Sequence, residues 1–276
     1  MELGIFAKTF VRSSLEETLD AVQGSGLNGI QFNMACAGLP SMPDQVETET
    51  AARVRAEAGR RKLAIHAVSG TYNMAHPDPE VRRLGLVKLR NLAAVCGTMG
   101  TSVITLCTGS RDPDHMWRRH PANDSQEAWD DMTASMEQAL EIAEAYQVTL
   151  AIEPEAANIV SDAGRAQSLL RLMQSERLKV VMDAANLFHP GNVADMKGVL
   201  HHAFELLGEQ IVLAHAKDFT AGDELSFVAA GQGMLDYDCY ISLLRSASFD
   251  GPLIMHGLGE TQVAASTAFL HSKLGM

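Results

Sequence analysis

Four residues with metal-binding or acid–base side chains lie at the ends of short apolar segments in the second half of the chain. Glu153 ends VTLAIE, Asp183 ends LKVVMD, His215 lies within IVLAHA, and His256 ends PLIMH. Each one alone has an ordinary structural explanation, but four in succession, about one strand and one helix apart, indicate a shared site. Mixed carboxylate and imidazole ligands suit Mn²⁺, Co²⁺, Fe²⁺, Zn²⁺ or Mg²⁺. The sequence therefore predicts a divalent metal site, provided that the fold brings these segment ends together.

The apolar segments have the length and composition of strands buried on both faces, because their apolar character is continuous rather than alternating. They cover residues 4–7, 29–32, 63–68, 102–107, 148–153, 178–183, 211–216 and 252–256. Helical periodicity occupies the segments between and after them: residues 15–23, 48–62, 79–95, 126–146, 161–173, 192–208, 237–247 and 261–274. Ser13 with Glu16 predicts a capping box for the first helix, and Ser125 is expected to cap the fourth.

Eight strands that alternate with eight helices predict a single α/β domain over residues 1–276, a (β/α)8 TIM barrel. The alternative is an open doubly wound sheet, but no GxGxxG motif follows the first strand. In a TIM barrel the active site is built from the C-terminal ends of the strands. This fold would bring Glu153, Asp183, His215 and His256 to neighbouring positions on one rim.

Further candidate residues lie close to these strand ends. Lys217 shares the face of His215 in HAKDF and can meet an anionic group or a developing oxyanion, although a salt bridge with Asp218 is an alternative. Asn186 and His189 follow Asp183 in DAANLFHPG. Asn186 is expected to orient the carboxylate or to contact substrate, and His189 is a second candidate for substrate binding.

The first half of the chain supplies other candidates for substrate binding. His66 lies in the third strand, and Asn73 and His76 lie in the polar, turn-rich loop that follows it. The long loop after the fourth strand, which contains Trp117, is predicted to be a lid or a substrate wall. Three arginines of this loop are candidates to bind a phosphate or a carboxylate: Arg111, Arg118 and Arg119.

Composition excludes several classes of function. With 46% hydrophobic and 20% charged residues the chain is an ordinary globular protein. A formal net charge of −12 opposes binding to nucleic acid or to anionic membranes, and we find no concentrated basic patch. The sequence has neither a leader-like N-terminus nor an apolar run of membrane-spanning length, so we expect a cytoplasmic location.

Four motifs together resemble the xylose-isomerase-like TIM-barrel superfamily, and most closely its sugar phosphate isomerase/epimerase branch. They are IEPE from residue 152, MDAANLFHPG from residue 182, HAKDF from residue 215 and GQGMLDY from residue 231. The resemblance implies a divalent metal, often Mn²⁺, held by Glu153, Asp183 and His215 together with a ligand from the eighth strand. It also implies a small carbohydrate substrate and a homodimer or homotetramer.

The eighth strand departs from the pattern of this family. In the epimerases of the family the fourth ligand is usually a Glu, and two glutamates act as acid and base on the two faces of the substrate. Here the stretch is LIMHGLGE, with His256 at that position and Glu260 four residues later, and either of the two can complete the site. His256 can ligate the metal through a neutral nitrogen or act as a general acid or base. The departure questions the two-glutamate mechanism.

These residues predict an isomerase or epimerase of a small ketose, sugar phosphate or sugar acid. Glu153 or His256 would remove a proton beside a carbonyl to give a metal-stabilised enediolate, with Lys217 as a further catalytic group. The main alternative is a metal-dependent decarboxylase of a 3-oxo sugar acid, with His256 as proton donor. Two others are a non-catalytic sugar-binding protein and a DNA-repair enzyme related to the abasic-site endonucleases. A histidine ligand of those endonucleases is Asn186 here, which argues against DNA repair.

Overall fold

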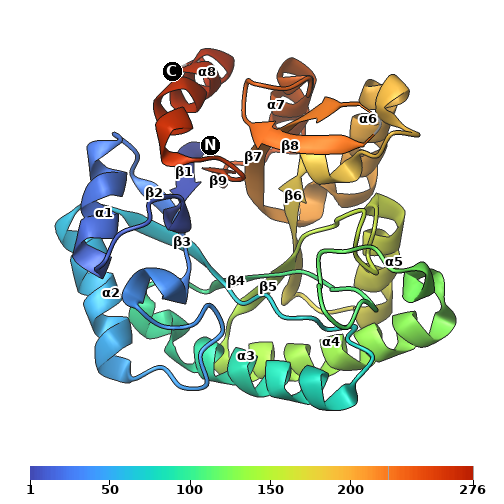
Figure 1. The fold of residues 1–276 in the computed structure, drawn as a ribbon, viewed down its shortest axis with the longest axis horizontal. Coiled ribbons are helices and arrows are strands. Elements are labelled where there is room, and N and C mark those ends of the chain that lie inside the picture. Colours follow the sequence, from blue (N-terminus) through green and yellow to red (C-terminus); the bar gives the residue numbers. More distant parts are fainter. Residues whose placement is uncertain (223, 276) are drawn as a thin grey trace.

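Eight parallel strands close into a barrel in the computed structural model, which describes residues 1–222 and 224–275. The barrel strands are β1 (Glu2–Phe6), β2 (Gly29–Phe32), β3 (Ala64–Ser69), β4 (Val103–Leu106), β5 (Thr149–Ile152), β6 (Leu178–Asp183), β7 (Ile211–Ala221) and β9 (Pro252–Met255). Each strand pairs with its neighbours, β9 pairs with both β7 and β1, and this closes the sheet (Figure 1). The predicted TIM barrel is confirmed.

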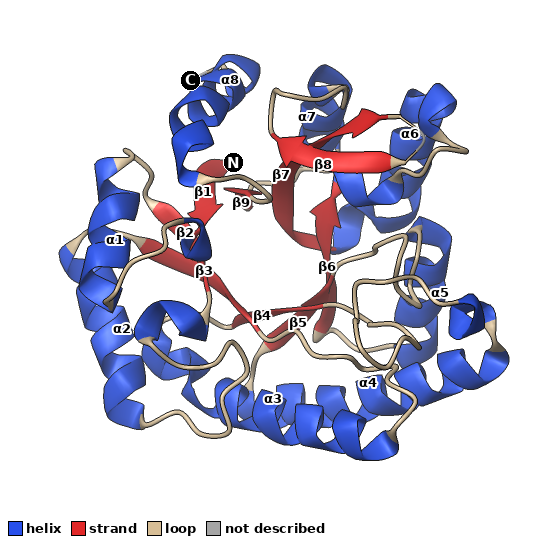
Figure 2. Cartoon of the chain, in the orientation of Figure 1, coloured by secondary structure: helices blue, strands red, loops and turns tan. Residues whose placement is uncertain are grey.

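The described residues form eight α-helices. The helices surround the strands (Figure 2). They are α1 (Leu15–Gly24), α2 (Thr48–Arg60), α3 (Pro79–Met99), α4 (Gln126–Tyr146), α5 (Ala163–Met173), α6 (Met196–Leu207), α7 (Tyr237–Ser246) and α8 (Val263–Leu274). Short 3₁₀ helices occupy Ala7–Thr9, Met34–Ala37, Pro121–Asp124, Ala184–Leu187, Val193–Asp195, Gly208–Gln210 and Glu260–Gln262. Within the described part of the chain, none of the helices combines the length and apolar character needed to span a membrane.

Two of the predicted helix caps can be compared with the structure. The side chain of Ser125 accepts a hydrogen bond from the Ala128 N–H at the start of α4, as predicted. The cap of α1 lies one residue later than predicted, because Ser14 accepts from the Glu17 N–H while the Ser13 hydroxyl donates to the Glu17 carboxylate. The capping residues of α1 are therefore Ser14 and Glu17, each one residue later than the predicted Ser13 and Glu16.

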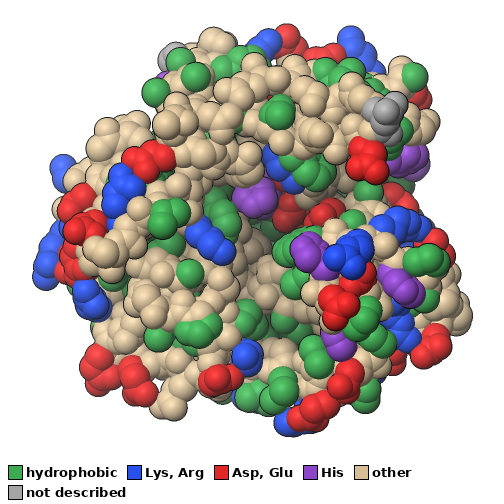
Figure 3. Space-filling model, in the orientation of Figure 1, with side chains coloured by type: hydrophobic (Ala, Val, Ile, Leu, Met, Phe, Trp, Pro, Cys, Tyr) green, Lys and Arg blue, Asp and Glu red, His purple; other side chains and the backbone are tan. Residues whose placement is uncertain are grey.

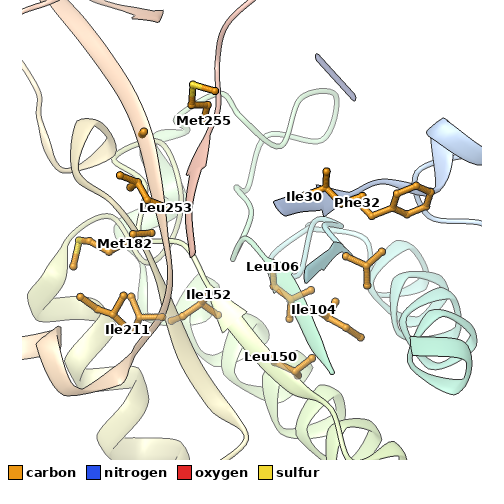
Figure 4. Close-up of a cluster of buried hydrophobic side chains, with 14 of the residues drawn as sticks. Ile30, Phe32, Ile104, Leu106, Leu150, Ile152, Met182, Ile211, Leu253 and Met255 are labelled. Carbon is orange, nitrogen blue, oxygen red and sulfur yellow. The ribbon is translucent and has the colours of Figure 1, made fainter. Parts of the chain in front are cut away.

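The two faces of the strands have different roles. The outward-facing side chains pack against the helices in one large apolar cluster, part of which is drawn in Figure 4 with Ile30, Ile104 and Ile152 among its members. A second, smaller cluster joins side chains from five strands and fills the barrel interior: Ala67, Ala151, Val181, Leu213 and Ile254.

This inner cluster positions the polar site. Alternate residues of a strand share a face, so the residue two positions after an interior side chain also points inward. Glu153, Asp183, His215 and His256 each follow a member of the inner cluster by two positions. The apolar interior of the barrel is therefore covered, at the C-terminal ends of the strands, by a layer of ionisable groups.

One strand extends beyond the barrel and forms a hairpin that the sequence pattern did not indicate. Strand β7 was expected to end at residue 216, but it continues to Ala221 and pairs antiparallel with β8 (Leu225–Ala229). The buried Asp218 of β7 accepts hydrogen bonds from the N–H groups of Gly231, Gly233 and Leu235, in the segment after β8. One carboxylate on β7 thus holds the glycine-containing segment that follows the hairpin.

Candidate active site

A cavity of about 650 Å³ opens at the C-terminal end of the barrel. Figure 3 shows it as a hollow near the centre of the face, with histidine, acidic and basic side chains gathered in it. Its lining includes Glu153, His215, Lys217 and His256. Lys217 lies on β7, and His256 directly follows β9. A cavity of this volume is in the range that binds small organic ligands.

Asp183, His215 and His256 form a cluster in which one ligand atom from each lies within 4.8 Å of the others. The Nδ1 atom of His215 is 3.5 Å from the Oδ2 atom of Asp183 and 3.3 Å from the Oε1 atom of Glu153. The Nδ1 atom of His256 lies 3.9 Å from the same Asp183 oxygen, and its ring stacks on His215 with 4.8 Å between centroids. The structure thus brings together the four side chains that the strand ends supply.

Two atoms of this cluster are suited to ligate a cation. Asp183 Oδ2 and His256 Nδ1 are buried and make no hydrogen bond within the described residues, and the one close charged contact of Asp183 Oδ2 besides the histidines is the Lys217 ammonium at 3.1 Å. Buried polar atoms are rarely without partners in native proteins, and each such atom calls for an explanation. A carboxylate oxygen and an imidazole nitrogen are suitable donors for a divalent transition metal. The cluster therefore fits the metal that the sequence implied.

The orientation of His215 is set by Gln31 on β2. The Gln31 amide nitrogen donates to the hydroxyls of Ser69 and Thr105, both at 3.1 Å, and its oxygen lies 2.9 Å from His215 Nε2. Because an amide oxygen only accepts, Nε2 of His215 carries a proton in this arrangement. In neutral His215 the lone pair is then on Nδ1, the atom that faces Asp183 and Glu153.

Lys217 and Asn186 connect the carboxylates of the cluster. The Lys217 ammonium is 3.1 Å from Asp183 Oδ2 and also donates to the side-chain oxygen of Asn186. The Asn186 amide in turn donates to Glu153 Oε1 at 2.6 Å. Lys217 therefore forms its ion pair with Asp183 and not with Asp218, whose oxygens are engaged by backbone N–H groups.

The charges of the cluster control one another. Burial alone would raise the pKa of Asp183, but Lys217 and His215 outweigh it and hold that pKa well below its usual range. Burial alone would lower the pKa of His215, whereas the carboxylates of Glu153 and Asp183 raise it to about 9. Asp183 is thus held in its charged form between Lys217 and protonated His215.

Two further ionisable groups line the cavity in their neutral forms near pH 7. Burial lowers the pKa of His256 to about 3, and the positive charges of His215 and Lys217 lower it as well. Burial raises the pKa of Glu155 to about 8, with a further contribution from Glu153. His256 is consequently a neutral imidazole, the form in which a ring nitrogen can ligate a metal, and its charged, proton-donating form is scarce.

The structure does not bring the other predicted substrate-binding histidines to the cavity. In the pairing of β2 with β3, Ile30 is opposite Ile65 and Gln31 is opposite Ala67, so His66 is the extra residue of a bulge. Its Nε2 atom lies 3.3 Å from the Glu2 carboxylate, at the start of β1 and thus at the opposite end of the barrel. We therefore leave His66 out of the proposed site.

Asn73, His76 and His189 have structural contacts in loops. Asn73 donates to the Ser110 carbonyl and accepts from the Ser110 N–H, which ties two loops together. His76 accepts from the Asp78 N–H, and the exposed His189 accepts from the Gly191 N–H. None of these three belongs to the described side chains that line the cavity.

The alternative to His256 as the fourth member of the cluster was Glu260. Both carboxylate oxygens of Glu260 bind the guanidinium of Arg12, at 2.6 and 2.8 Å, and Glu260 does not belong to the described lining of the cavity. The structure therefore places His256, rather than Glu260, beside Asp183.

Several cavity residues were not among the predicted site residues. They include Gln31, Ser69, Thr105, Glu155 and Phe227. Gln31 could have been found, because a lone polar residue interrupts the continuous apolar run of a strand buried on both faces. Phe227 could not, since it lies on the hairpin strand β8, for which the sequence pattern gave no signal.

A family model described as the xylose isomerase-like TIM barrel matches residues 19–272. The chain belongs to this family. No curated protein matches the sequence. Solved structures share this fold. The chain resembles them in structure but has low sequence identity to them, so the similarity shows the fold alone.

Three of these solved structures illustrate the range of the xylose isomerase-like barrels. The 3-keto-D-glucoside 4-epimerase YcjR from E. coli is 16% identical, with a TM-score of 0.74 over 99% of each chain. The probable 3-DHS dehydratase AsbF from Bacillus anthracis is 16% identical, with a TM-score of 0.77 over 98% of each chain. The IOLI protein with a bound zinc atom is 14% identical, with a TM-score of 0.76 over 100% of this chain and 98% of that one.

Proposed function

We propose that this protein is a divalent-metal-dependent isomerase or epimerase of a small carbohydrate. The observation that carries the proposal is the meeting of Glu153, Asp183, His215 and His256 at the base of one cavity, at the catalytic end of the barrel. The similar folds of a sugar epimerase and of a zinc-bound protein support the substrate class and the metal.

Asp183, His215 and His256 would hold the cation, with Glu153 as the fourth ligand. We propose Mn²⁺, the ion that the family resemblance implies. Co²⁺, Mg²⁺ and Zn²⁺ are alternatives, because mixed carboxylate and imidazole sites accept all of these ions. When bound, such a cation polarises a substrate carbonyl and acidifies the neighbouring C–H.

The side chains around the cluster would perform the proton transfer. Glu153 takes the proton from the carbon beside the carbonyl, and the Asn186 amide, which donates to Glu153 Oε1, fixes the orientation of that carboxylate. Lys217 stabilises the negative charge that develops on the carbonyl oxygen as the enediolate forms. His256 acts as a ligand, so Glu153 alone serves as the base, unlike the two-glutamate mechanism of the family's epimerases. Protonated Glu153 would return the proton to the neighbouring carbon in an isomerisation. In an epimerisation the proton would reach the opposite face from another acid, and Glu155, whose pKa burial raises to about 8, also lines the cavity.

The decarboxylase alternative is less well supported by this geometry. It requires His256 to deliver a proton to the enolate that remains after CO₂ leaves, but burial holds the pKa of His256 at about 3, so its charged, proton-donating form is scarce near neutral pH. The isomerase proposal needs a base that removes a proton and, once protonated, returns it to carbon, together with an oxyanion stabiliser; Glu153 and Lys217 both line the cavity.

Solvent isotope exchange tests the proposal. The protein is incubated in D₂O with Mn²⁺ and a panel of ketoses, keto sugars and sugar acids, and the metal is removed by a chelator before NMR and mass spectrometry. We expect deuterium on the carbon next to the carbonyl, with the carbon skeleton intact. Loss of CO₂ or of water from a substrate would instead assign a lyase reaction, and the absence of exchange with every carbohydrate would contradict the proposal.

Replacement of Gln31 tests the role of the residue that orients His215. We expect Gln31→Ala to weaken metal binding by about 10- to 100-fold, the usual cost of losing a partner behind a metal ligand. Gln31→Glu keeps an acceptor oxygen for His215 Nε2 and should retain most of the affinity. Calorimetric titration with Mn²⁺ measures both variants. Gln23→Ala, which removes a surface contact with the Arg61 carbonyl, is the control, and unchanged affinity in Gln31→Ala would contradict the assignment.

A further inference from the structure

Two large aromatic side chains are exposed at the mouth of the cavity. Trp117 is 45% and Phe227 is 48% exposed, and both belong to the cavity lining. Large apolar side chains in water forgo the stabilisation that burial would give them, and such groups beside a cavity indicate a binding surface. They come from two segments that are far apart in the sequence, the loop after β4 and the hairpin strand β8.

The backbone carbonyls on both sides of Trp117 accept hydrogen bonds from side chains. The carbonyl of Met116 accepts a hydrogen bond from the Asn158 amide at 3.4 Å, and the carbonyl of Arg118 accepts one from the Ser110 hydroxyl at 2.6 Å. Trp117 is therefore exposed by a loop of defined structure and not because its segment lacks contacts.

Phe227 is held in a comparable way by the hairpin. In the antiparallel register it is opposite Phe219, which is fully buried, and the Lys217 ammonium lies 4.0 Å from the centroid of the Phe227 ring. The Phe227 ring thus lies against the Lys217 ammonium and in the cavity lining, and it is nevertheless exposed to solvent.

The three arginines near this rim are already paired with carboxylates. Arg111 binds Asp131 and Glu127, Arg118 binds Asp112, and Arg119 binds Asp124. None of these arginines belongs to the described cavity lining, so they are not placed to bind a substrate phosphate or carboxylate. Two lysines do line it, Lys8 and Lys217, and Lys217 is paired with Asp183. The described rim therefore presents two exposed aromatic rings, Trp117 and Phe227, and one lysine without a carboxylate partner, Lys8.

We propose that Trp117 and Phe227 form a subsite for a second ring carried by the substrate, so that the substrate is an uncharged glycoside rather than a free sugar or a sugar phosphate. The proposal rests on the proposed function, which places the reacting sugar beside Asp183 and Glu153. The cavity of about 650 Å³ has room for more than one sugar ring. Aromatic faces bind the apolar faces of aromatic and sugar rings without a requirement for charge.

Fluorescence of Trp117 tests the subsite directly. The chain has 2 tryptophans, Trp117 and Trp129, so Trp129→Phe leaves Trp117 as the single reporter. Phenyl glucoside and cellobiose, as non-reacting probes in the presence of Mg²⁺, should change its emission, and they should bind about tenfold more tightly than glucose or glucose 6-phosphate. Binding of glucose or of its phosphate as tightly as the phenyl glucoside, or no response to either two-ring probe, would overturn the proposal.

Calorimetry with the other variants gives a test that does not depend on the reporter. Trp117→Ala and Phe227→Ala should each weaken phenyl glucoside binding by about three- to tenfold and leave glucose binding unchanged. Tyr146→Ala is the matched control, because Tyr146 is 39% exposed and lies outside the described cavity lining. An equal loss for both probes would mean that the rings contact the reacting sugar, which contradicts a separate subsite.

The outcome is distinguishable from a failure of the proposed function. If deuterium exchange occurs equally well in free keto sugars and in their phenyl glycosides, the subsite is wrong and the isomerase proposal stands. If two-ring probes bind at Trp117 but no carbohydrate exchanges deuterium, the subsite stands and the proposed reaction is wrong.

Discussion

Replacing Asp183 with Asn should reduce metal affinity by at least about 100-fold and remove carbohydrate exchange activity with it. Loss of a partner behind a metal ligand already costs about 10- to 100-fold, and Asp183 is proposed as a direct ligand. Its Oδ2 atom lies within 4 Å of His215 Nδ1, of Lys217 Nζ and of His256 Nδ1, at 3.5, 3.1 and 3.9 Å. No other described carboxylate is placed between both histidines of the cluster.

The choice of Asn preserves the local fold. Asp183 Oδ1 accepts a hydrogen bond from the Ala185 N–H at the start of the 3₁₀ helix Ala184–Leu187, and an Asn side-chain oxygen can accept the same bond. Metal content after dialysis and calorimetric titration measure the effect, and circular dichroism checks the fold. Asp238→Asn, at an exposed ion pair with Lys273, is the control. A folded Asp183→Asn protein that retained one equivalent of metal would disprove the proposed site.

The sequence predicted the barrel well because its elements carry strong local signals. Strands buried on both faces show unbroken apolar runs, and the helices between them show clear periodicity. The same signals predicted which residues meet, since Glu153, Asp183, His215 and His256 share the inward parity of β5, β6, β7 and β9. What was missed is the part that leaves the barrel: Lys217 and Asp218 interrupt the apolar run of β7, so its continuation into a hairpin was hidden.

Side-chain roles in loops and at irregular strands could not be predicted in the same way. His66 was assigned to the site because it lies in β3. It is, however, the extra residue of a bulge in β3, opposite the step from Ile30 to Gln31, and Ser69 is the residue of this strand that lines the cavity. Asn73 and Asn186 look alike in sequence, as polar residues shortly after a strand. One ties two loops together through Ser110 and the other contacts Glu153, a difference that depends on three-dimensional neighbours.

Replacing Glu153 with Gln should separate proton transfer from metal binding. We expect deuterium exchange to fall by about 10²- to 10⁴-fold, the usual contribution of a positioned general base, because the amide cannot accept a proton at neutral pH. Metal binding should weaken less than in Asp183→Asn, since Asp183, His215 and His256 remain. The Gln side-chain oxygen can still accept the hydrogen bond that Asn186 now donates to Glu153. Parallel metal titration and isotope exchange would measure the two effects on the same sample.

A control and a second carboxylate make this prediction specific. Glu260→Gln, which alters a carboxylate bound to Arg12 outside the described cavity lining, should leave exchange unchanged. Exchange that persisted in Glu153→Gln would mean that another group takes the proton, and the other glutamate in the described lining is Glu155. Exchange lost in Glu153→Gln with metal still bound would instead identify one carboxylate as the base. His256, at the position where the related epimerases carry their second glutamate, would then serve the metal.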